Sequence, residues 1–164
     1  VSAGKTHAGT GFRRLSGTEQ IMSKPANYAS PEDVEQAFYE TVLKGDADLL
    51  MQLWAEDEET LCVHPTGVRL QGIAPIRESW RGIFANAKLR VQAESLAHWQ
   101  GSVLAIHHLT EILFVGDDPG PHGPLHVTHV YARGAHGWRL VSRHASAADD
   151  SHQAMADAVP YTLH

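Results

Sequence analysis

The stretch Leu61–Trp80, LCVHPTGVRLQGIAPIRESW, decides the fold, because a short strand, a polar break and an amphipathic helix follow one another in it without spare residues. Side chains alternate along a strand, so Cys62 and His64 share one face. Pro65 has no backbone N–H to donate, and it disfavours helical dihedral angles at His64, so strand pairing is predicted to stop there. One imidazole is therefore expected at the end of a strand.

The second half of this stretch predicts a helix. After a turn at Thr66-Gly67, apolar residues recur at helical spacing from Gly72 onward. Pro75 is compatible with the helix because it falls in the first turn. The helix is expected to bury Trp80, which would lie beside the imidazole at the strand end.

Two further helices are predicted before this stretch, within residues 30–54. Ser30 suits the N-cap of the first helix, Pro31 its first position, and Asp33 an imperfect capping box. Gly45 suits a left-handed C-cap, which separates this helix from a second, shorter one.

Long β-prone runs follow in residues 89–99, 103–115, 125–133 and 138–146. The GAHG sequence between the last two runs predicts a hairpin. If Arg133 faces Trp138 across this hairpin, then Val127 faces His144. Both faces of residues 103–115 are apolar, so the face that lines the interior is left open. The inward face of the last two strands is expected to carry Leu125, Val127, His129, Tyr131, Trp138, Leu140 and His144.

Together these elements predict an α+β fold, in which three N-terminal helices pack on a strongly curved antiparallel sheet and enclose a pocket. Residues 30–148 would form this single domain. Residues 1–29 are expected to be a flexible arm and residues 149–164 a polar tail, because neither shows strong periodicity.

Composition excludes several classes of protein. The formal net charge of -6, with no long basic run, argues against a nucleic-acid partner. No apolar run approaches the roughly 18 residues of a membrane span. Cys62 is the single cysteine, so no intrachain disulfide is expected, and a reducing, cytoplasmic setting fits.

Three histidines are the candidates for chemistry in the predicted pocket. His64, His129 and His144 are all expected to face inward. Burial disfavours the charged imidazole, so a pocket histidine would be neutral near pH 7 and able to act as a general base. A second imidazole could donate a hydrogen bond to a developing enolate oxygen. The alternative to a catalytic role is a structural one, in which these histidines are hydrogen-bonded members of the core.

The remaining candidates are pocket walls rather than reactive groups. Trp54, Trp80 and Tyr131 are core aromatics that would also contact a ligand, and Cys62 is interpreted as a small buried residue rather than a nucleophile. No local metal-binding spacing is found, because alternation sends neighbouring histidines to opposite faces of their strands. A metal site formed by His64, His129 and His144 from three strands is geometrically open, but neither a metal nor a cofactor is expected.

The helix pair, the strand-turn-helix stretch and the run of long strands together resemble the nuclear transport factor 2-like superfamily. This superfamily includes ketosteroid isomerases, polyketide cyclases of the SnoaL type, dehydratases and the association domain of calmodulin-dependent kinases. The resemblance spans residues 30–148. The resemblance implies a cystatin-like cone with a ligand pocket. It predicts the fold more specifically than the function.

The resemblance to ketosteroid isomerases also implies roles for single residues. Their catalytic base precedes a proline at the end of the first strand, a place that falls on His64 here. Their acidic oxyanion donor falls on His129, while Trp80 and His144 match inward positions. Their tyrosine donor falls on Phe38, which has no hydroxyl group, so steroid isomerisation is not expected.

Three functions follow as hypotheses. The first is a cofactor-independent isomerase, cyclase or dehydratase with His64 as base and His129 as donor. The second is a module that binds a small apolar molecule without chemistry, with Cys62, Trp54, Trp80, Tyr131 and His144 contacting the ligand. The third is an assembly domain that forms a homodimer through the sheet face, as the resemblance to kinase association domains implies.

Overall fold

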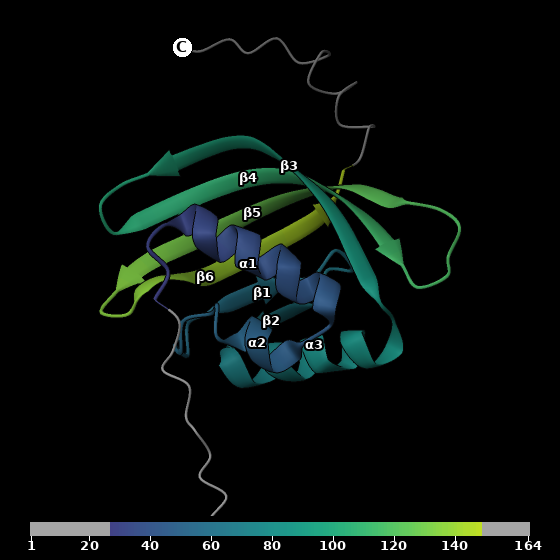
Figure 1. The fold of residues 1–164 in the computed structure, drawn as a ribbon, viewed down its shortest axis with the longest axis horizontal. Coiled ribbons are helices and arrows are strands. Elements are labelled where there is room, and N and C mark those ends of the chain that lie inside the picture. The colour runs from purple at the N-terminus through teal and green to yellow at the C-terminus, as the bar shows by residue number, and fades with distance from the viewer. Residues whose placement is uncertain (1–26, 149–164) are drawn as a thin grey trace, which may run out of the picture.

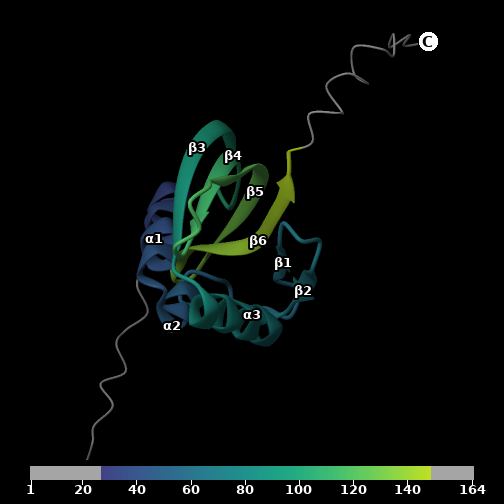
Figure 2. The same ribbon diagram turned by 90° about the vertical axis from the view of Figure 1, so that its right-hand side faces the viewer.

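The computed structural model describes residues 27–148, which form three helices and one curved sheet. The six strands are ordered β2-β1-β6-β5-β4-β3, and all neighbours are antiparallel except β1 and β6. The long strands arch above α3, and α1 crosses them (Figures 1 and 2). The predicted α+β class is confirmed. In chain order the elements are α1 (Pro31–Lys44), α2 (Ala47–Met51), β1 (Leu61–Val63), β2 (Arg69–Gln71), α3 (Ile73–Asn86), β3 (Leu89–Gln100), β4 (Leu104–Val115), β5 (His122–Gly134) and β6 (Gly137–Ala147).

Helix α1 begins and ends where the sequence predicts. The Ser30 hydroxyl accepts from the backbone N–H of Asp33 at 3.1 Å, and the Asp33 carboxylate accepts from the backbone N–H of Ser30 at 3.0 Å. Gly45 closes the helix in the left-handed region at φ 69. An N-cap such as Ser30 stabilises a helix by about 1 kcal/mol.

The predicted arm and tail lie mostly outside the described residues, but residues 27–29 are described and contact the last hairpin. The backbone N–H of Trp138 donates to the carbonyl of Tyr28 at 3.0 Å. Gly137 adopts φ 81, and a Cβ atom there would collide with Asn27 and Tyr28. The hairpin therefore requires glycine at this position, both for its dihedral angle and for the close approach of the chain.

The stretch that decides the fold forms the predicted strand, turn and helix, with one addition. His64 follows β1, and its backbone N–H donates to the carbonyl of Val68 at 2.9 Å. The chain then returns as β2, a short strand antiparallel to β1 that the sequence did not predict. Helix α3 starts after Gly72 and buries Ile76 and Trp80.

A β-bulge in β6 changes the predicted faces of the last two strands. Val130 pairs with Ser142 and Tyr131 with Leu140, so Val141 is an extra residue on β6. Beyond it the alternation is shifted by one residue. The expected pairing of Val127 with His144 is therefore wrong, since Val127 pairs with Ala145.

This shift decides which polar side chain of β6 faces inward. His144 is exposed on the outer face, so the expectation that it lies inward is wrong. Arg143 takes the inward place and is only 4% exposed. The other six residues predicted to face inward on β5 and β6 are buried.

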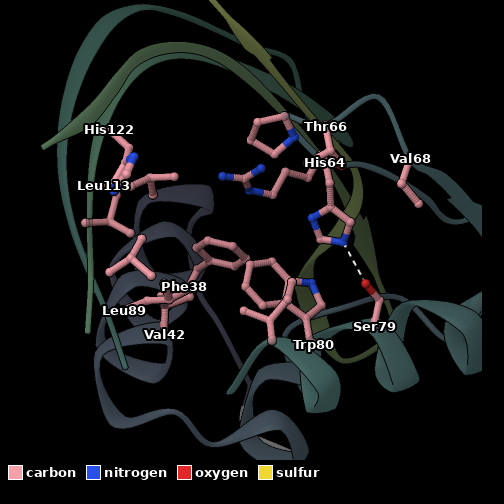
Figure 3. Close-up of a pocket in the computed structure, with 15 residues that line it drawn as sticks. Phe38, Val42, His64, Thr66, Val68, Ser79, Trp80, Leu89, Leu113 and His122 are labelled. Carbon is pink, nitrogen blue, oxygen red and sulfur yellow. Dashed lines mark hydrogen bonds between the residues drawn. The ribbon is translucent and has the colours of Figure 1, made fainter. Parts of the chain in front are cut away.

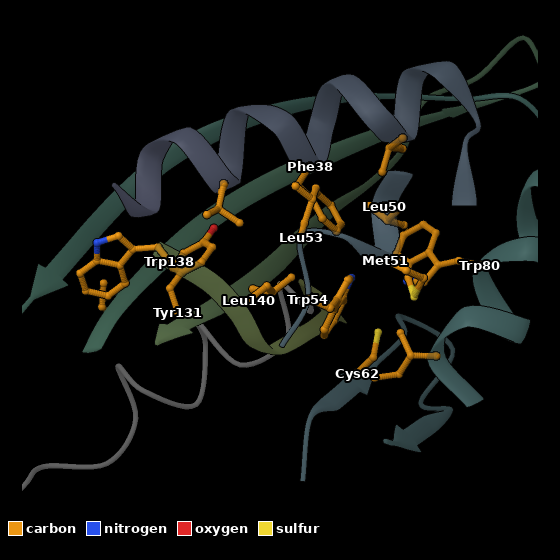
Figure 4. Close-up of a cluster of buried hydrophobic side chains, with 14 residues drawn as sticks. Phe38, Leu50, Met51, Leu53, Trp54, Cys62, Trp80, Tyr131, Trp138 and Leu140 are labelled. Atoms are coloured by element: carbon orange, nitrogen blue, oxygen red, sulfur yellow. The ribbon is translucent and has the colours of Figure 1, made fainter. Parts of the chain in front are cut away.

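The hydrophobic core lies between the helices and the inner face of the sheet (Figure 4). On β4 the inner face carries Ala105, His107, Leu109 and Glu111, which settles the face that the sequence left open. In the described part of the chain, no helix combines the length and apolar character needed to cross a membrane. The largest apolar members of the core that are completely buried are Phe38, Leu50, Leu53, Trp54, Ile76, Tyr131 and Leu140.

Candidate functional site

A cavity of about 470 Å³ lies under the arch of the sheet, bounded below by α1 and α3 (Figure 3). Phe38 and Val42 of α1 and Trp80 of α3 form its floor, and aliphatic side chains of β3 and β4 form a wall. A concave, mainly apolar cavity with a few polar groups is the usual form of a small-molecule site. Its polar lining consists of His64, Thr66, Ser79, His122 and Arg143.

His64 reaches this cavity because β1 ends immediately before it. Its Nε2 atom lies 2.9 Å from the hydroxyl oxygen of Ser79, and its ring packs edge-on against Trp80 with the ring centres 5.5 Å apart. The residue is 8% exposed. Burial lowers the pKa of His64 below its ordinary value, and the nearby charge of Arg143 lowers it further. The imidazole is therefore uncharged at neutral pH.

Arg143 is the second polar group of the cavity, and it was not found from the sequence. Its Nη2 atom donates to Glu111 Oε2 at 2.6 Å, and the hydroxyl of Tyr39 donates to Glu111 Oε1 at 2.8 Å. Glu111 is 0% exposed. Burial is the largest single effect and acts to lower the pKa of Arg143, but the charge of Glu111, its hydrogen bond and the nearby Tyr39 and Cys62 together raise that pKa above its ordinary value. The guanidinium is thus a fixed cation at the cavity.

The structure places His129 in a different environment. His129 is buried but does not line the cavity; its Nδ1 atom lies 2.9 Å from the hydroxyl oxygen of Tyr131. That hydroxyl donates to Glu35 Oε2 at 3.2 Å, and His107 Nδ1 lies 2.7 Å from the same oxygen. Burial lowers the pKa of His129 well below its ordinary value, and Arg143 and His107 add to the effect.

The other predicted site residues divide between the cavity and the core. Trp80 lines the cavity as expected. Cys62 is buried with its sulfur 4.0 Å from His64 Nε2, and burial raises the pKa of its thiol to about 11. Trp54 and Tyr131 are core residues outside the cavity lining, and His144 is on the outer face.

The cavity thus combines an uncharged imidazole and a buried guanidinium within apolar walls. A neutral imidazole can accept a proton, and a guanidinium can donate hydrogen bonds to an oxygen that gains negative charge. Both effects are stronger where the surrounding groups are apolar, because the local dielectric constant is lower there. Among residues 27–148, no cluster of three or more His, Cys, Asp or Glu side chains is arranged to hold a metal ion.

The curved sheet and the helices beneath it form a cystatin-like fold, as in solved structures of similar proteins. The sequence profile of the SnoaL-like domain matches residues 32–150, so the chain belongs to the SnoaL-like domain family. No curated protein matches the chain.

Several solved structures are similar to this chain. A proposed calcium/calmodulin-dependent protein kinase type II association domain from Thiobacillus denitrificans is 33% identical, with a TM-score of 0.70 over 77% of this chain and 100% of that chain. A proposed dehydratase of the nuclear transport factor 2-like family from Streptomyces avermitilis is 27% identical, with a TM-score of 0.63 over 71% of this chain and 91% of that chain. A protein from Novosphingobium aromaticivorans, 20% identical with a TM-score of 0.61 over 76% of this chain and 83% of that chain, shares the fold.

Proposed function

We propose that this SnoaL-like domain binds a small apolar molecule in the cavity, and that His64 acts on it as a general base without a cofactor. The reaction class is proton transfer, as in isomerases, cyclases and dehydratases. The observation that carries the proposal is a buried imidazole at an apolar cavity that also holds the guanidinium of Arg143. The similarity to the proposed dehydratase from Streptomyces avermitilis supports this class.

The hydrogen bond to Ser79 gives His64 the form that a base needs. Figure 3 shows one ring nitrogen bonded to Ser79 and the other directed toward the cavity. When Nε2 carries the proton and donates to the Ser79 hydroxyl oxygen, Nδ1 keeps its lone pair and accepts a proton from the ligand. Ser79 is then a positioning residue, because it fixes the tautomer and the orientation of the ring.

Arg143 supplies the electrostatic half of the reaction. The proton leaves a carbon next to a carbonyl group and moves to His64 Nδ1. The electron pair of the broken C–H bond forms a carbon–carbon double bond, and the π electron pair of the carbonyl group moves onto its oxygen. The guanidinium of Arg143 donates a hydrogen bond to that oxygen. The proton then returns to a carbon of the same molecule. In this proposal the donor is Arg143, which lines the cavity, instead of His129, which does not.

Solvent exchange tests the base directly. In deuterated buffer, the domain should speed the exchange of the methyl protons of 2-acetylnaphthalene, followed by proton NMR. His64→Ala should lower the protein-dependent rate about a hundredfold or more, which is the usual contribution of a general base. The matched control is His144→Ala, which removes an exposed imidazole and should keep the rate. Equal rates for His64→Ala and the unaltered domain would refute the proposal.

Assembly is a second candidate function, compatible with the first. The similarity to the association domain from Thiobacillus denitrificans favours it, as does the outer surface at the β3–β4 end of the sheet. Four large apolar side chains are exposed there: Leu96, Trp99, Val103 and Leu104. The exposed fraction is 58% for Trp99 and 62% for Val103. An exposed apolar patch of this kind is typical of a protein interface. We propose a homodimer through this face.

Sedimentation velocity tests the assembly. The unaltered domain should sediment as a dimer or larger oligomer at micromolar concentration, and Trp99→Ser should shift it toward the monomer. The control is Trp138→Phe, because Trp138 is buried and does not contribute to the outer surface. A strict monomer for the unaltered domain at these concentrations would rule out this interface.

A further inference from the structure

We infer that the cavity is built for an uncharged ligand with an acceptor oxygen, such as a ketone, and against a carboxylate. This inference rests on the proposed function and specifies its substrate class. It follows from the charge balance around Arg143 and from the donors that Arg143 leaves without a partner.

The charge of Arg143 is already compensated inside the protein. Among the described residues that line the cavity, Arg143 alone carries a permanent charge. Its counter-charge is the carboxylate of Glu111, which lies 2.6 Å from Nη2 and is completely buried. The hydroxyl of Tyr39 donates to the other oxygen of that carboxylate at 2.8 Å. The arginine and the glutamate therefore form a neutral pair before any ligand enters.

The guanidinium nevertheless has hydrogen-bonding capacity to spare. Nη2 donates to Glu111, Nε is enclosed without a partner, and Nη1 makes no hydrogen bond within residues 27–148. Because Arg143 lines the cavity, Nη1 is the atom placed to donate to a ligand. Unlike Nε, Nη1 is not fully enclosed, so a ligand oxygen can reach it and gain a charge-assisted hydrogen bond from it.

An uncharged oxygen and a carboxylate differ in the net charge that the site carries once the ligand is bound. A carbonyl oxygen accepts from Nη1 and leaves the site neutral. A carboxylate would place a second negative charge beside the Arg143–Glu111 pair, in a cavity whose other walls are mainly apolar. An uncompensated charge in such surroundings is costly. The imidazole of His64 cannot offset it, because His64 is uncharged at neutral pH.

Two probes of equal size test the preference. Isothermal titration calorimetry near pH 8 would compare 2-acetylnaphthalene with 2-naphthoate, both of which are small enough for a cavity of about 470 Å³. The ketone should bind the unaltered domain about tenfold or more tightly than the carboxylate. A carboxylate that binds as tightly as the ketone, or more tightly, overturns the inference while leaving the proposed pocket intact. Failure of both probes to bind refutes the proposed function and the inference with it.

Two variants locate the origin of the preference. Glu111→Gln removes the counter-charge of Arg143, so it should shift the ratio of the two affinities about tenfold or more toward the carboxylate. Tyr39→Phe is the matched control, because it removes a hydrogen bond to the same carboxylate but no charge, and it should keep the preference for the ketone. An unchanged ratio in folded Glu111→Gln overturns the charge argument. If Glu111→Gln does not fold, the relative affinities of the unaltered domain for the ketone and the carboxylate decide whether the inference holds.

Discussion

Replacing Arg143 by methionine should destabilise the fold by about 3–5 kcal/mol, because it leaves the carboxylate of Glu111 buried without its cation. Glu111 is 0% exposed and has two partners, the guanidinium at 2.6 Å and the hydroxyl of Tyr39 at 2.8 Å. After the substitution only the hydroxyl remains. Since domains are commonly stable by about 5–15 kcal/mol, the loss would be a large share of the total.

The magnitude can be checked with a double-mutant cycle. Urea denaturation, followed by tryptophan fluorescence, would give free energies of unfolding for the unaltered domain, Arg143→Met, Glu111→Gln and the double variant. Each single variant leaves one buried charge uncompensated, whereas the double variant removes both. The double variant should therefore be more stable than the sum of the single losses predicts, by about 1–3 kcal/mol. Additive losses, or a loss below about 1 kcal/mol for Arg143→Met, would refute the idea of a buried, mutually compensated pair.

Three further predictions concern stability and reactivity. The pKa values of His129 and His64 lie below the ordinary value of 6.5 in the folded chain, so below that pH the unfolded state binds more protons than the folded state. The free energy of unfolding should thus be fully present above about pH 6.5 and fall on acidification, which urea melts at several pH values would reveal; a rise on acidification would contradict the burial of these rings. Gly137→Ala should lower the melting temperature markedly, while Gly134→Ala should change it little, because an added Cβ meets nothing within 4 Å at Gly134. Iodoacetamide should modify the buried thiol of Cys62, whose pKa is raised to about 11, slowly in the folded protein and rapidly in urea; rapid modification of the folded protein would argue against this burial.

The sequence was sufficient for the elements whose ends are marked by local chemistry. Ser30, Pro31 and Gly45 mark the limits of α1 because capping and left-handed dihedral angles depend on single residues. His64 was placed at a strand end because Pro65 cannot continue the ladder. These inferences needed no knowledge of distant contacts, and the structure confirms them.

Arg143 was missed because its orientation depends on a long-range contact. Regular alternation from the hairpin predicts that His144 faces inward, and nothing in the sequence around Val141 marks the extra residue. The partnership of Arg143 with Glu111 joins positions 32 residues apart on strands that are not neighbours in the sheet. An arginine in a strand is usually assigned to the surface, so only the fold could bring it to the cavity.

The hydrogen-bonded group around His129 was hidden for the same reason. Glu35 belongs to α1, His107 to β4 and Tyr131 to β5, and they meet only because α1 crosses the inner face of the sheet. In the sequence, Glu35 reads as an ordinary surface residue of an amphipathic helix. A helical pattern tells which face is apolar, but it does not tell which polar residue at the margin of that face will be covered.

The extra residue in β6 lies between two parts of the strand whose pairing with neighbouring strands is fixed. The tight turn at Gly134–Gly137 sets the register at one end, and the parallel pairing with β1 sets it at the other. The pairing of β6 with β5 is shifted by one residue between the two ends of β6, and the unpaired Val141 accounts for this shift. An insertion or deletion at Val141 should therefore leave both the hairpin with β5 and the pairing with β1 in place. An insertion or deletion elsewhere in β6 would disrupt one of these two pairings. For protein engineering, this makes Val141 the point at which the strand is most easily lengthened or shortened.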